Sequence, residues 1–459
     1  MTEAVSQATT SAPARRVDPS CAAIVVLYVL LCAAYIAVIP PGYGPDEREH
    51  TNSIRLLAEH GQLSVYLGGT KGGTGGGHAL HPPLYYASQI PMYYLARKPG
   101  PEVAGRTILA MRLTSVLWGL LTLWQLWLFL RETFPERRHV RLAVFGFIAF
   151  LPEFMLVSSV VNNDIAAAFF GILLLRKLAA MLREGSSTRL AVHVGLAMAG
   201  FAWAKAQMIM LLPLGVGWLL CLVLWKRTDL RRALRDGAIA YGLLVVLGCW
   251  WYLRNWTIYG HIMPPGLEQW GPHGPDGRLM TPMEVYTSGL FAPLLWRSLV
   301  GLAASVWAQV DWFLNPPPPT VFSVPVPSVV PYALLGLLSA AAMAGHVRTW
   351  LVRRRAAVEL SEEELTVSRI AWLSYAEFGL IYLAVTYMAI FVHLGWYQGG
   401  RYLCPADWAL ALFVVLGLAK LWPAAERRLV YVAPGLLLAL NGLCLFNLIA
   451  ILNPAYVVR

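Results

Sequence analysis

Apolar runs of about 18 to 25 residues recur along the chain, and they constrain its fold more than any other feature. Each run forms a helix long enough to cross the hydrocarbon core of a bilayer, which is about 30 Å thick. The composition agrees, because 58% of the 459 residues are hydrophobic and only 13% are charged. A soluble protein of this length carries roughly a quarter charged residues. The sequence therefore predicts an all-α polytopic membrane protein.

Eleven of these runs are expected to cross the membrane, with the amino terminus in the cytoplasm and the carboxyl terminus outside. Residues 286–311 are also apolar and end in tryptophans, so we expect a helix that lies in or dips into the outer interface. The expected crossings are 21–39, 106–130, 141–157, 164–183, 189–204, 206–225, 236–254, 327–346, 368–394, 402–421 and 429–452.

The net charge of +11 comes from basic clusters that fall repeatedly on one predicted side of the membrane. Lys and Arg are enriched in cytoplasmic loops, so these clusters indicate topology and argue against a nucleic-acid partner. The six cysteines are scattered without C-x-x-C spacing, and neither a disulfide framework nor a zinc site is expected. The clusters are Arg15-Arg16, Arg131 to Arg141, Arg176 to Arg189, Lys226 to Arg235, Arg348 to Arg369 and Lys420 to Arg428.

The chain is expected to form one membrane domain. Residues 1–19 are polar and predicted to be a disordered cytoplasmic segment, followed by a retained signal-anchor helix in a single domain over 20–459. Two long loops, 40–105 and 255–326, fall on the predicted outer side. The first contains a glycine-rich run, Gly68 to Gly77, which we interpret as a mobile loop over a site. The run Pro316 to Pro319 is predicted to form a stiff polyproline spacer before the next helix.

The first loop opens with Pro40-Pro41-Gly42-Tyr43-Gly44-Pro45-Asp46-Glu47-Arg48-Glu49-His50. The prolines and glycines end the preceding helix, and Asp46 is a suitable N-cap for a helix over Glu47 to His60. Glu47 and His50 are three residues apart, so one helical face could offer both to a divalent metal. Two ligands do not close a metal site, and a capped helix with one surface histidine is favoured.

Several ionisable residues lie at the predicted outer ends of membrane helices, where burying a charge is costly unless it is paired or wetted. Alone, each could snorkel to the head groups or cap a helix. All fall on the same predicted face as Asp46 and Glu47, which favours a shared polar cavity. Such a cavity suits an anionic lipid phosphate and an acceptor hydroxyl. The ionisable residues at helix ends are Asp164, Lys205, Arg254 and Arg401; their neighbours Asn163, Asn255 and Tyr402, together with His81 of the first loop, fall on the same predicted face.

Five short motifs occur in a characteristic order between residues 40 and 410. They are Pro-x-Asp-Glu at Asp46-Glu47, His81-Pro-Pro-Leu-Tyr85-Tyr, Asn162-Asn163-Asp164, Arg254-Asn255-Trp-x-x-Tyr-Gly, and Gln-Gly-Gly-Arg401-Tyr402. The sequence resembles the GT-C membrane glycosyltransferases, in particular bacterial relatives of protein O-mannosyltransferases and of lipid A aminoarabinose transferase. It departs from that pattern in having His81 where Lys or Gln is common, and an extra glycine before Arg401.

The resemblance implies a GT-C-like fold, a polyprenyl-phosphate sugar donor, an extracytoplasmic active site in the bacterial inner membrane, and inversion at the anomeric carbon. It places the catalytic acid at Asp46, with Glu47 beside it to orient Asp46 or the acceptor. His50, His81, Tyr85 and the cations at the helix ends would then bind substrate. The main alternative is a transporter or flippase of a lipid-linked sugar, which would use the same cavity for binding alone. Transporters tend to show internal repeats and broken helices at the midplane, and we find no internal repeat.

Overall fold

The computed structural model describes residues 18–66, 80–98, 100, 103–206, 212–262, 272–307, 329–356, 359–391 and 399–449. Within these residues the secondary structure is helical apart from one isolated bridge, His273 to Leu279. Gly68 to Gly77 and Pro316 to Pro319 lie outside them, and so does most of the predicted disordered segment 1–19. The helices are α1 (Pro19–Val38), α2 (Glu47–His60), α3 (Leu84–Ala96), α4 (Gly105–Thr133), α5 (Arg138–Ala149), α6 (Pro152–Ser159), α7 (Asp164–Glu184), α8 (Thr188–Ala204), α9 (Leu212–Leu224), α10 (Leu230–Leu243), η3 (Leu244–Gly248), α11 (Trp250–Tyr259), α12 (Pro282–Thr287), α13 (Phe291–Trp307), α14 (Val329–Ala356), α15 (Glu362–Phe391), η6 (Gly399–Ala406), α16 (Asp407–Leu421), η7 (Pro423–Ala425), α17 (Glu426–Leu429) and α18 (Val432–Asn447).

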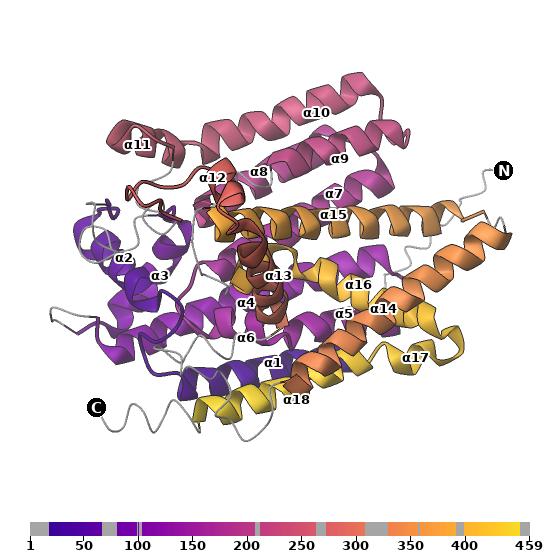
Figure 1. Ribbon diagram of the computed structural model, residues 1–459, viewed down its shortest axis with the longest axis horizontal. Coiled ribbons are helices and arrows are strands. Elements are labelled where there is room, and N and C mark those ends of the chain that lie inside the picture. Colours follow the sequence, from indigo (N-terminus) through magenta and orange to yellow (C-terminus); the bar gives the residue numbers. More distant parts are fainter. Residues whose placement is uncertain are drawn as a thin grey trace, which may run out of the picture.

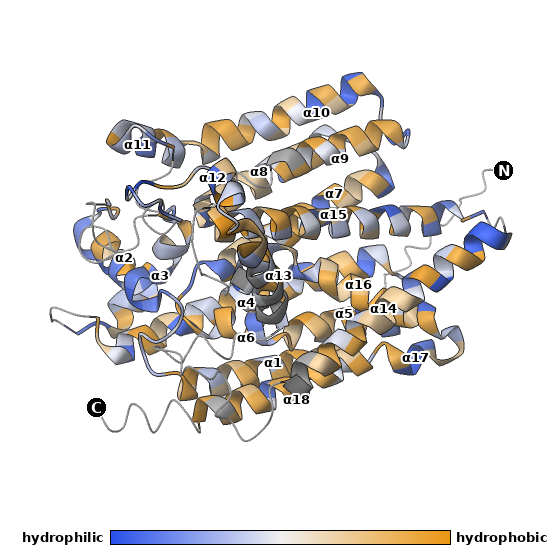
Figure 2. Cartoon of the chain, viewed as in Figure 1, coloured by the Kyte–Doolittle hydropathy of each residue, from blue (hydrophilic) through white to orange (hydrophobic). Residues whose placement is uncertain are grey.

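The long helices lie side by side and run in the same general direction across the molecule (Figure 1). The short helices α2, α3 and α11 gather at one end of this bundle, on the left of the view. The free ends of α14 and α15 and the short helix α17 lie at the other end. Figure 2 shows that the helix bodies are mainly apolar, whereas hydrophilic residues collect near the two ends. This distribution is expected for a bundle whose middle crosses the hydrocarbon core.

Among the residues that the structure describes, seven helices are long and apolar enough to cross a membrane, so the chain is a multi-pass membrane protein. Two further pairs of helices are long and apolar enough only when taken together, and both pairs are bent: α5 with α6 by 54°, and α10 and η3 with α11 by 47°. The other two predicted crossings, 189–204 and 206–225, appear as α8 with 17 residues and α9 with 13 described residues. Both are shorter than a straight span, so the structure supports seven to nine crossings and eleven stays a prediction.

The core of the bundle is centred on α16. This helix belongs to Gly400–Leu421, the most buried of the seven candidate membrane spans, in which 83% of the most apolar 18 residues lie inside the protein. Close approach of α14 explains this burial. A Cβ added at Gly417 would lie 2.4 Å from the carbonyl oxygen of Ala342, and one at Gly345 would overlap the carbonyl of Gly417. Small residues let two membrane helices approach until their backbones touch. The α14–α16 contact therefore depends on glycine.

The residues between α1 and α4 form α2 and α3, which pack on each other, and α3 also packs on α4. The second predicted loop contains α12 and α13. The expected interfacial helix at 286–311 corresponds to α13, which packs against η6 and α15 and runs at a steep angle to the long helices in Figure 1. The three segments that carry the predicted site residues in the first loop, at α7 and at η6 are thereby brought to one region.

Candidate functional site

The chain leaves α1 through a compact turn that places Asp46 at the start of α2. Gly42 and Asp46 have left-handed backbone conformations, with φ of 84° and 53°. Asp46 occupies the N-cap position, but its side chain makes no capping hydrogen bond. The expectation that Asp46 caps α2 through its side chain is therefore wrong, because the left-handed backbone aims its carboxylate elsewhere. A non-glycine residue in this region is uncommon, although Asp and Asn adopt it more readily than other residues, and such conformations are concentrated at functional sites.

Glu47 holds this turn in place. Its buried carboxylate accepts hydrogen bonds from the backbone N–H groups of Gly42 (2.9 Å) and Gly44 (3.2 Å). It also accepts from the N–H of Val161 (2.8 Å), at the end of α6. Arg112 of α4 completes the arrangement with two hydrogen bonds, Nε to Oε1 at 2.9 Å and a terminal nitrogen to Oε2 at 2.7 Å. Both side chains are fully buried. Glu47 thus fastens three segments around Asp46.

The guanidinium of Arg112 donates its remaining hydrogen bonds to the end of α1 and the start of the same turn. One terminal nitrogen donates to the carbonyl oxygens of Ile39 (2.7 Å) and Ile36 (3.3 Å), and the other donates to Pro40 (3.0 Å). These are carbonyls that the end of α1 leaves without helical partners. A single guanidinium therefore ties the end of α1 to the first half of α4 and neutralises Glu47.

The segment Asn162-Asn163-Asp164 forms the turn that leads from α6 into α7, and this turn contacts the Asp46 turn. The Asn162 amide donates to the carbonyl of Pro45 (3.1 Å), and its side-chain oxygen accepts from the N–H of Asp164 (2.8 Å). Asn163 donates to the carbonyl of Ala204 (2.9 Å), the last residue of α8. The Tyr85 hydroxyl accepts the N–H of Asn162 (2.9 Å) and contacts Ser115 (2.7 Å). The asparagines and Tyr85 thus fix Asp164 next to the Asp46 turn.

Four charged side chains of alternating sign connect the Asp46 turn with the turn before α7. Arg401, from η6, donates to Asp46 Oδ2 at 2.6 Å, and its Nε lies 3.8 Å from Asp164 Oδ2. Lys205, at the end of α8, forms an ion pair with the other oxygen of Asp164. The Lys205 ammonium also lies 4.4 Å from the centre of the Tyr402 ring. Arg401, Asp164 and Lys205 are buried, whereas 28% of the Asp46 side chain is exposed. Asp46 is therefore the member of this set that solvent or a substrate can reach.

The remaining predicted residues form two flanking groups. His50 is buried, its Nδ1 lies 3.0 Å from the Tyr86 hydroxyl, and its ring stacks on His81 with centroids 6.0 Å apart. Burial raises the pKa of Tyr86, with the Tyr85 and Asp46 charges adding to the effect, so this phenol stays protonated.

Arg254 lies against a different segment. It donates to the carbonyl of Ser64 (3.3 Å) and stacks over the Trp251 ring, while Asn255 donates to Ile262 (3.2 Å). The structure thus brings Lys205 and Arg401 together on Asp164 and places Arg254 beside the chain that follows α2.

Sequence reasoning missed Arg112 and the buried acids Glu153 and Asp407, although the signal was present. Each is an ionisable residue inside or at the edge of a predicted membrane helix, which by itself marks a structural or functional group. As for metals, no group of three or more His, Cys, Asp or Glu in the described ranges is arranged to hold an ion. The arrangement offers one accessible carboxylate beside a buried guanidinium and a buried ammonium, which is a proton acceptor next to an anion-binding position.

Residues 81–252 match the family model of dolichyl-phosphate-mannose-protein mannosyltransferases. The resemblance to GT-C membrane glycosyltransferases is confirmed over this segment. It contains His81, Tyr85, Asn163, Asp164 and Lys205, while Asp46, Arg254 and Arg401 lie outside it.

Two crystal structures of ArnT from Cupriavidus metallidurans are similar in outline. The apo structure has 16% sequence identity and a TM-score of 0.38 over 89% of this chain and 78% of that one. The structure bound to undecaprenyl phosphate has 15% identity and a TM-score of 0.39 over 88% and 77%. No protein of curated function matches the sequence.

Proposed function

We propose that this protein transfers a sugar from a polyprenyl-phosphate donor to a hydroxyl-bearing acceptor, with inversion at the anomeric carbon. The proposed site faces outward from the bacterial inner membrane. The observation that carries the proposal is the run of alternating charges Asp46–Arg401–Asp164–Lys205, in which only Asp46 is substantially accessible. The membrane glycosyltransferase match over 81–252 supports the same reaction class.

Asp46 acts as the general base in this proposal. The acceptor O–H loses its proton to the Asp46 carboxylate while the oxygen forms a bond to the anomeric carbon. The bond from that carbon to the phosphate oxygen breaks on the opposite face, so the configuration inverts. A carboxylate must be ionised to accept a proton, and the guanidinium of Arg401 at 2.6 Å favours the ionised form.

Arg401 and Lys205 bind the phosphate of the donor. Negative charge grows on that phosphate as the sugar leaves, and preorganised cations stabilise such charge most effectively in a buried position. Arg401 would exchange part of its contact with Asp46 for the phosphate, which frees the carboxylate for the acceptor. Asp164 keeps Lys205 and Arg401 oriented, and Tyr402 lies beneath both cations.

The other predicted residues surround this centre. We assign His50 and His81 to the side of the sugar or the acceptor, because both come from the segments next to Asp46. Tyr85 and Asn163 hold the turn that contains Asp164 in place through the hydrogen bonds described above. Arg254 lies beside residues 63–64, with Asn255 next to it in α11, and both would meet the donor as it approaches.

Replacing Asp46 with Asn tests the proposal. Asn also tolerates the left-handed backbone and can still accept from Arg401, so folding should be preserved. Turnover should fall by about two to four orders of magnitude, the usual contribution of a positioned base. The measurement is sugar transfer from a radiolabelled polyprenyl-phosphate donor at equal amounts of folded protein. The matched control is Asp276→Asn, which removes an exposed carboxylate paired with Arg278 outside the site and should leave transfer unchanged. Transfer by Asp46→Asn at the control rate would favour the transporter interpretation instead.

A further inference from the structure

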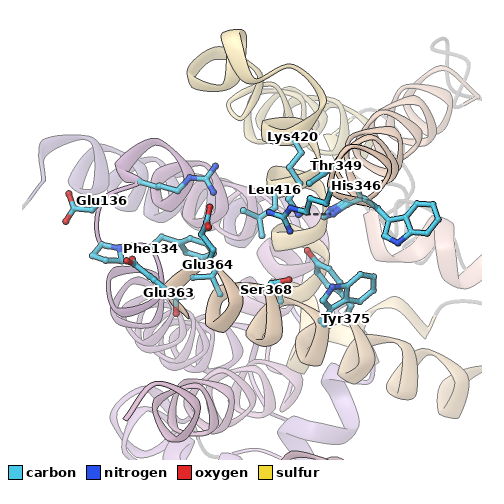
Figure 3. Close-up of a pocket in the computed structure, with 18 of the residues that line it drawn as sticks. Phe134, Glu136, His346, Thr349, Glu363, Glu364, Ser368, Tyr375, Leu416 and Lys420 are labelled. Carbon is cyan, nitrogen blue, oxygen red and sulfur yellow. Dashed lines mark hydrogen bonds between the residues drawn. The ribbon is translucent and has the colours of Figure 1, made fainter. Parts of the chain in front are cut away.

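A pocket of about 680 Å³ lies at the end of the bundle opposite Asp46, and the transferase proposal does not use it (Figure 3). It is enclosed by the turn after α4, the carboxyl-terminal half of α14, the first half of α15 and the end of α16. We call it the α14–α16 pocket. Its volume falls in the range of small-molecule sites, about 300–1,000 Å³. Its lining residues are Thr133 to Arg137, His346, Thr349, Trp350, Arg353, Arg354, Glu363, Glu364, Val367, Ser368, Ala371, Trp372, Tyr375, Leu416 and Lys420.

The charges of the α14–α16 pocket are separated along its length. Glu363 and Glu364 belong to the first turn of α15, at the end of the molecule. Tyr375 lies eleven residues further along that helix, which is about 16 Å at 1.5 Å per residue. In Figure 3 the labels Glu136, Glu363 and Glu364 lie on one side, and His346, Lys420 and Tyr375 lie on the other. The three carboxylates therefore lie at the outer end of the pocket, and the Lys420 ammonium lies with His346 and Tyr375 at the inner end. Arg353 and Arg354 belong to the last turn of α14, toward the end of the molecule.

Lys420 is oriented at the inner end by His346. The Nε2 atom of His346 lies 2.9 Å from the carbonyl oxygen of Phe413, which can only accept, so Nε2 carries a proton. The Nδ1 atom then accepts from the ammonium of Lys420 at 3.3 Å. This contact uses one of the three N–H donors of Lys420 and supplies no negative charge. The described chain shows no ion pair for Lys420, Arg353 or Arg354. An anionic group in the pocket would supply the missing counter-charge.

Two exposed tryptophans place the pocket at the level of lipid head groups. Trp350 and Trp372 both line it and are 56% and 66% exposed. Exposed tryptophans on a membrane bundle mark the interface between head groups and acyl chains. Arg353, Arg354 and Arg355 follow Trp350 in the last turn of α14, as expected for residues just outside the hydrocarbon core.

We propose that the α14–α16 pocket binds the head group of a zwitterionic phospholipid of the phosphatidylethanolamine type. The phosphate would lie between Lys420 and Arg353, and the ammonium beside Glu136 and Glu363. The acyl chains would leave past Trp372 into the bilayer. Four cations and three carboxylates line the pocket, and one of the cations, Arg137, already pairs with Glu426 outside the lining. A nearly neutral pocket with separated charges complements a zwitterion better than a purely anionic head group.

The test measures lipid binding by native mass spectrometry of the full-length protein in a non-ionic detergent. Dioctanoyl-phosphatidylethanolamine is titrated against dioctanoyl-phosphatidylglycerol, which has the phosphate without the ammonium, and against soluble phosphoethanolamine. The wild-type protein should bind one phosphatidylethanolamine more tightly than either alternative. Tighter binding of phosphatidylglycerol would overturn the zwitterionic assignment. Equal binding of phosphoethanolamine would identify a soluble phosphate ester as the occupant instead of a lipid.

Variants at the two ends separate their roles. Lys420→Gln and Arg353→Gln should each weaken the binding of both lipids by about tenfold or more, because each removes a charged hydrogen-bond donor to phosphate. Glu363→Gln should weaken phosphatidylethanolamine by about threefold, since an exposed ion pair contributes little, and should not weaken phosphatidylglycerol. Arg355→Gln and Glu359→Gln change the same charges outside the lining and should have no effect. Because Arg353 is only half-buried, its variant remains informative if Lys420→Gln fails to fold. If Arg355→Gln weakened lipid binding as much as Arg353→Gln, the lipid would not occupy this pocket.

Discussion

Asp46 and Glu47 are neighbours in the chain, yet their surroundings give them different properties. The Glu47 carboxylate accepts five hydrogen bonds and is fully buried. The Asp46 carboxylate reaches solvent and contacts a cation that a ligand can also use. These five donors occupy both Glu47 oxygens, which leaves little room for a substrate hydroxyl to approach them. Glu47 is therefore a positioning residue for Asp46 in our interpretation, and the two should respond differently to mutation.

We expect Glu47→Gln to act mainly on stability. The change leaves Arg112 as a buried charge without its partner and turns an amide N–H₂ toward groups that already donate. Breaking a buried ion pair in this way costs about 3–5 kcal/mol. The folded fraction and thermal midpoint should fall clearly, in contrast to Asp46→Asn, when both are measured by thermal unfolding in detergent. Arg112→Gln should destabilise similarly, and the double variant should lose less than the sum of the two. Additive losses would mean that the pair does not act as a unit.

The residue-level prediction of the site from sequence was limited by partners that are distant in the chain. The motif containing Asp46 and Glu47 could be recognised, but Arg112 lies 65 positions further on and sequence spacing does not reveal that contact. The same limit applies to Lys205 and Asp164, which were both noted as site residues although their ion pair was not predicted. The capping prediction for Asp46 failed because residue type does not determine the sign of φ.

At the scale of elements, the position of Arg401 depends on how η6 rests on α7. A Cβ added at Gly171 of α7 would lie 2.5 Å from the carbonyl oxygen of Pro405 and 2.6 Å from the Trp408 ring. The backbone of η6 therefore approaches α7 as closely as a glycine allows. Because η6 carries Arg401 and α7 begins at Asp164, this contact sets the spacing between the two charged side chains.

Gly171→Ala should therefore displace η6 and weaken donor binding. Overpacking a tight contact usually costs about 1–3 kcal/mol, and here the carbonyl of Pro405 cannot rotate away. We expect a raised KM for the polyprenyl-phosphate donor together with a lowered thermal midpoint. The matched control is Gly442→Ala in α18, where an added Cβ meets nothing within 4 Å. That control should be neutral or slightly stabilising, because Ala favours a helix over Gly by about 1 kcal/mol. Unchanged KM in Gly171→Ala would show that the η6–α7 contact does not position Arg401.

Most helices were predictable because their apolar runs are set by the thickness of the bilayer. The runs at 21–39, 106–130 and 164–183 correspond closely to α1, α4 and α7. The run at 141–157 became two helices bent by 54°. Hydropathy could not reveal the break, because Phe150 and Leu151, which lie between the two helices, are also apolar. Pro152 has no N–H to continue the ladder of helical hydrogen bonds, which explains the break once it is seen.

For the whole molecule, the two polar ends of the bundle are expected to lie on opposite sides of the membrane. The Asp46 site belongs to the end with α2 and α3, and the α14–α16 pocket belongs to the end with the arginines of α14 (Figure 1). Arginine-rich ends favour the cytoplasm, so the site should face outward and the pocket inward. The transferase proposal depends on this orientation, because an outward site requires the donor in the outer leaflet.

Cysteine labelling in intact cells tests the orientation directly. Gln62→Cys follows α2, Arg355→Cys ends α14, and both positions are exposed. A membrane-impermeant maleimide should label position 62 before lysis and position 355 only after the membrane is opened. The native protein serves as the background, since none of its six cysteines is fully exposed. The matched control labels both variants in detergent, where they should react equally. Labelling of position 355 and not of position 62 in intact cells would place the Asp46 site in the cytoplasm. Transfer would then have to draw on donor in the inner leaflet, and the α14–α16 pocket would bind lipid of the outer one.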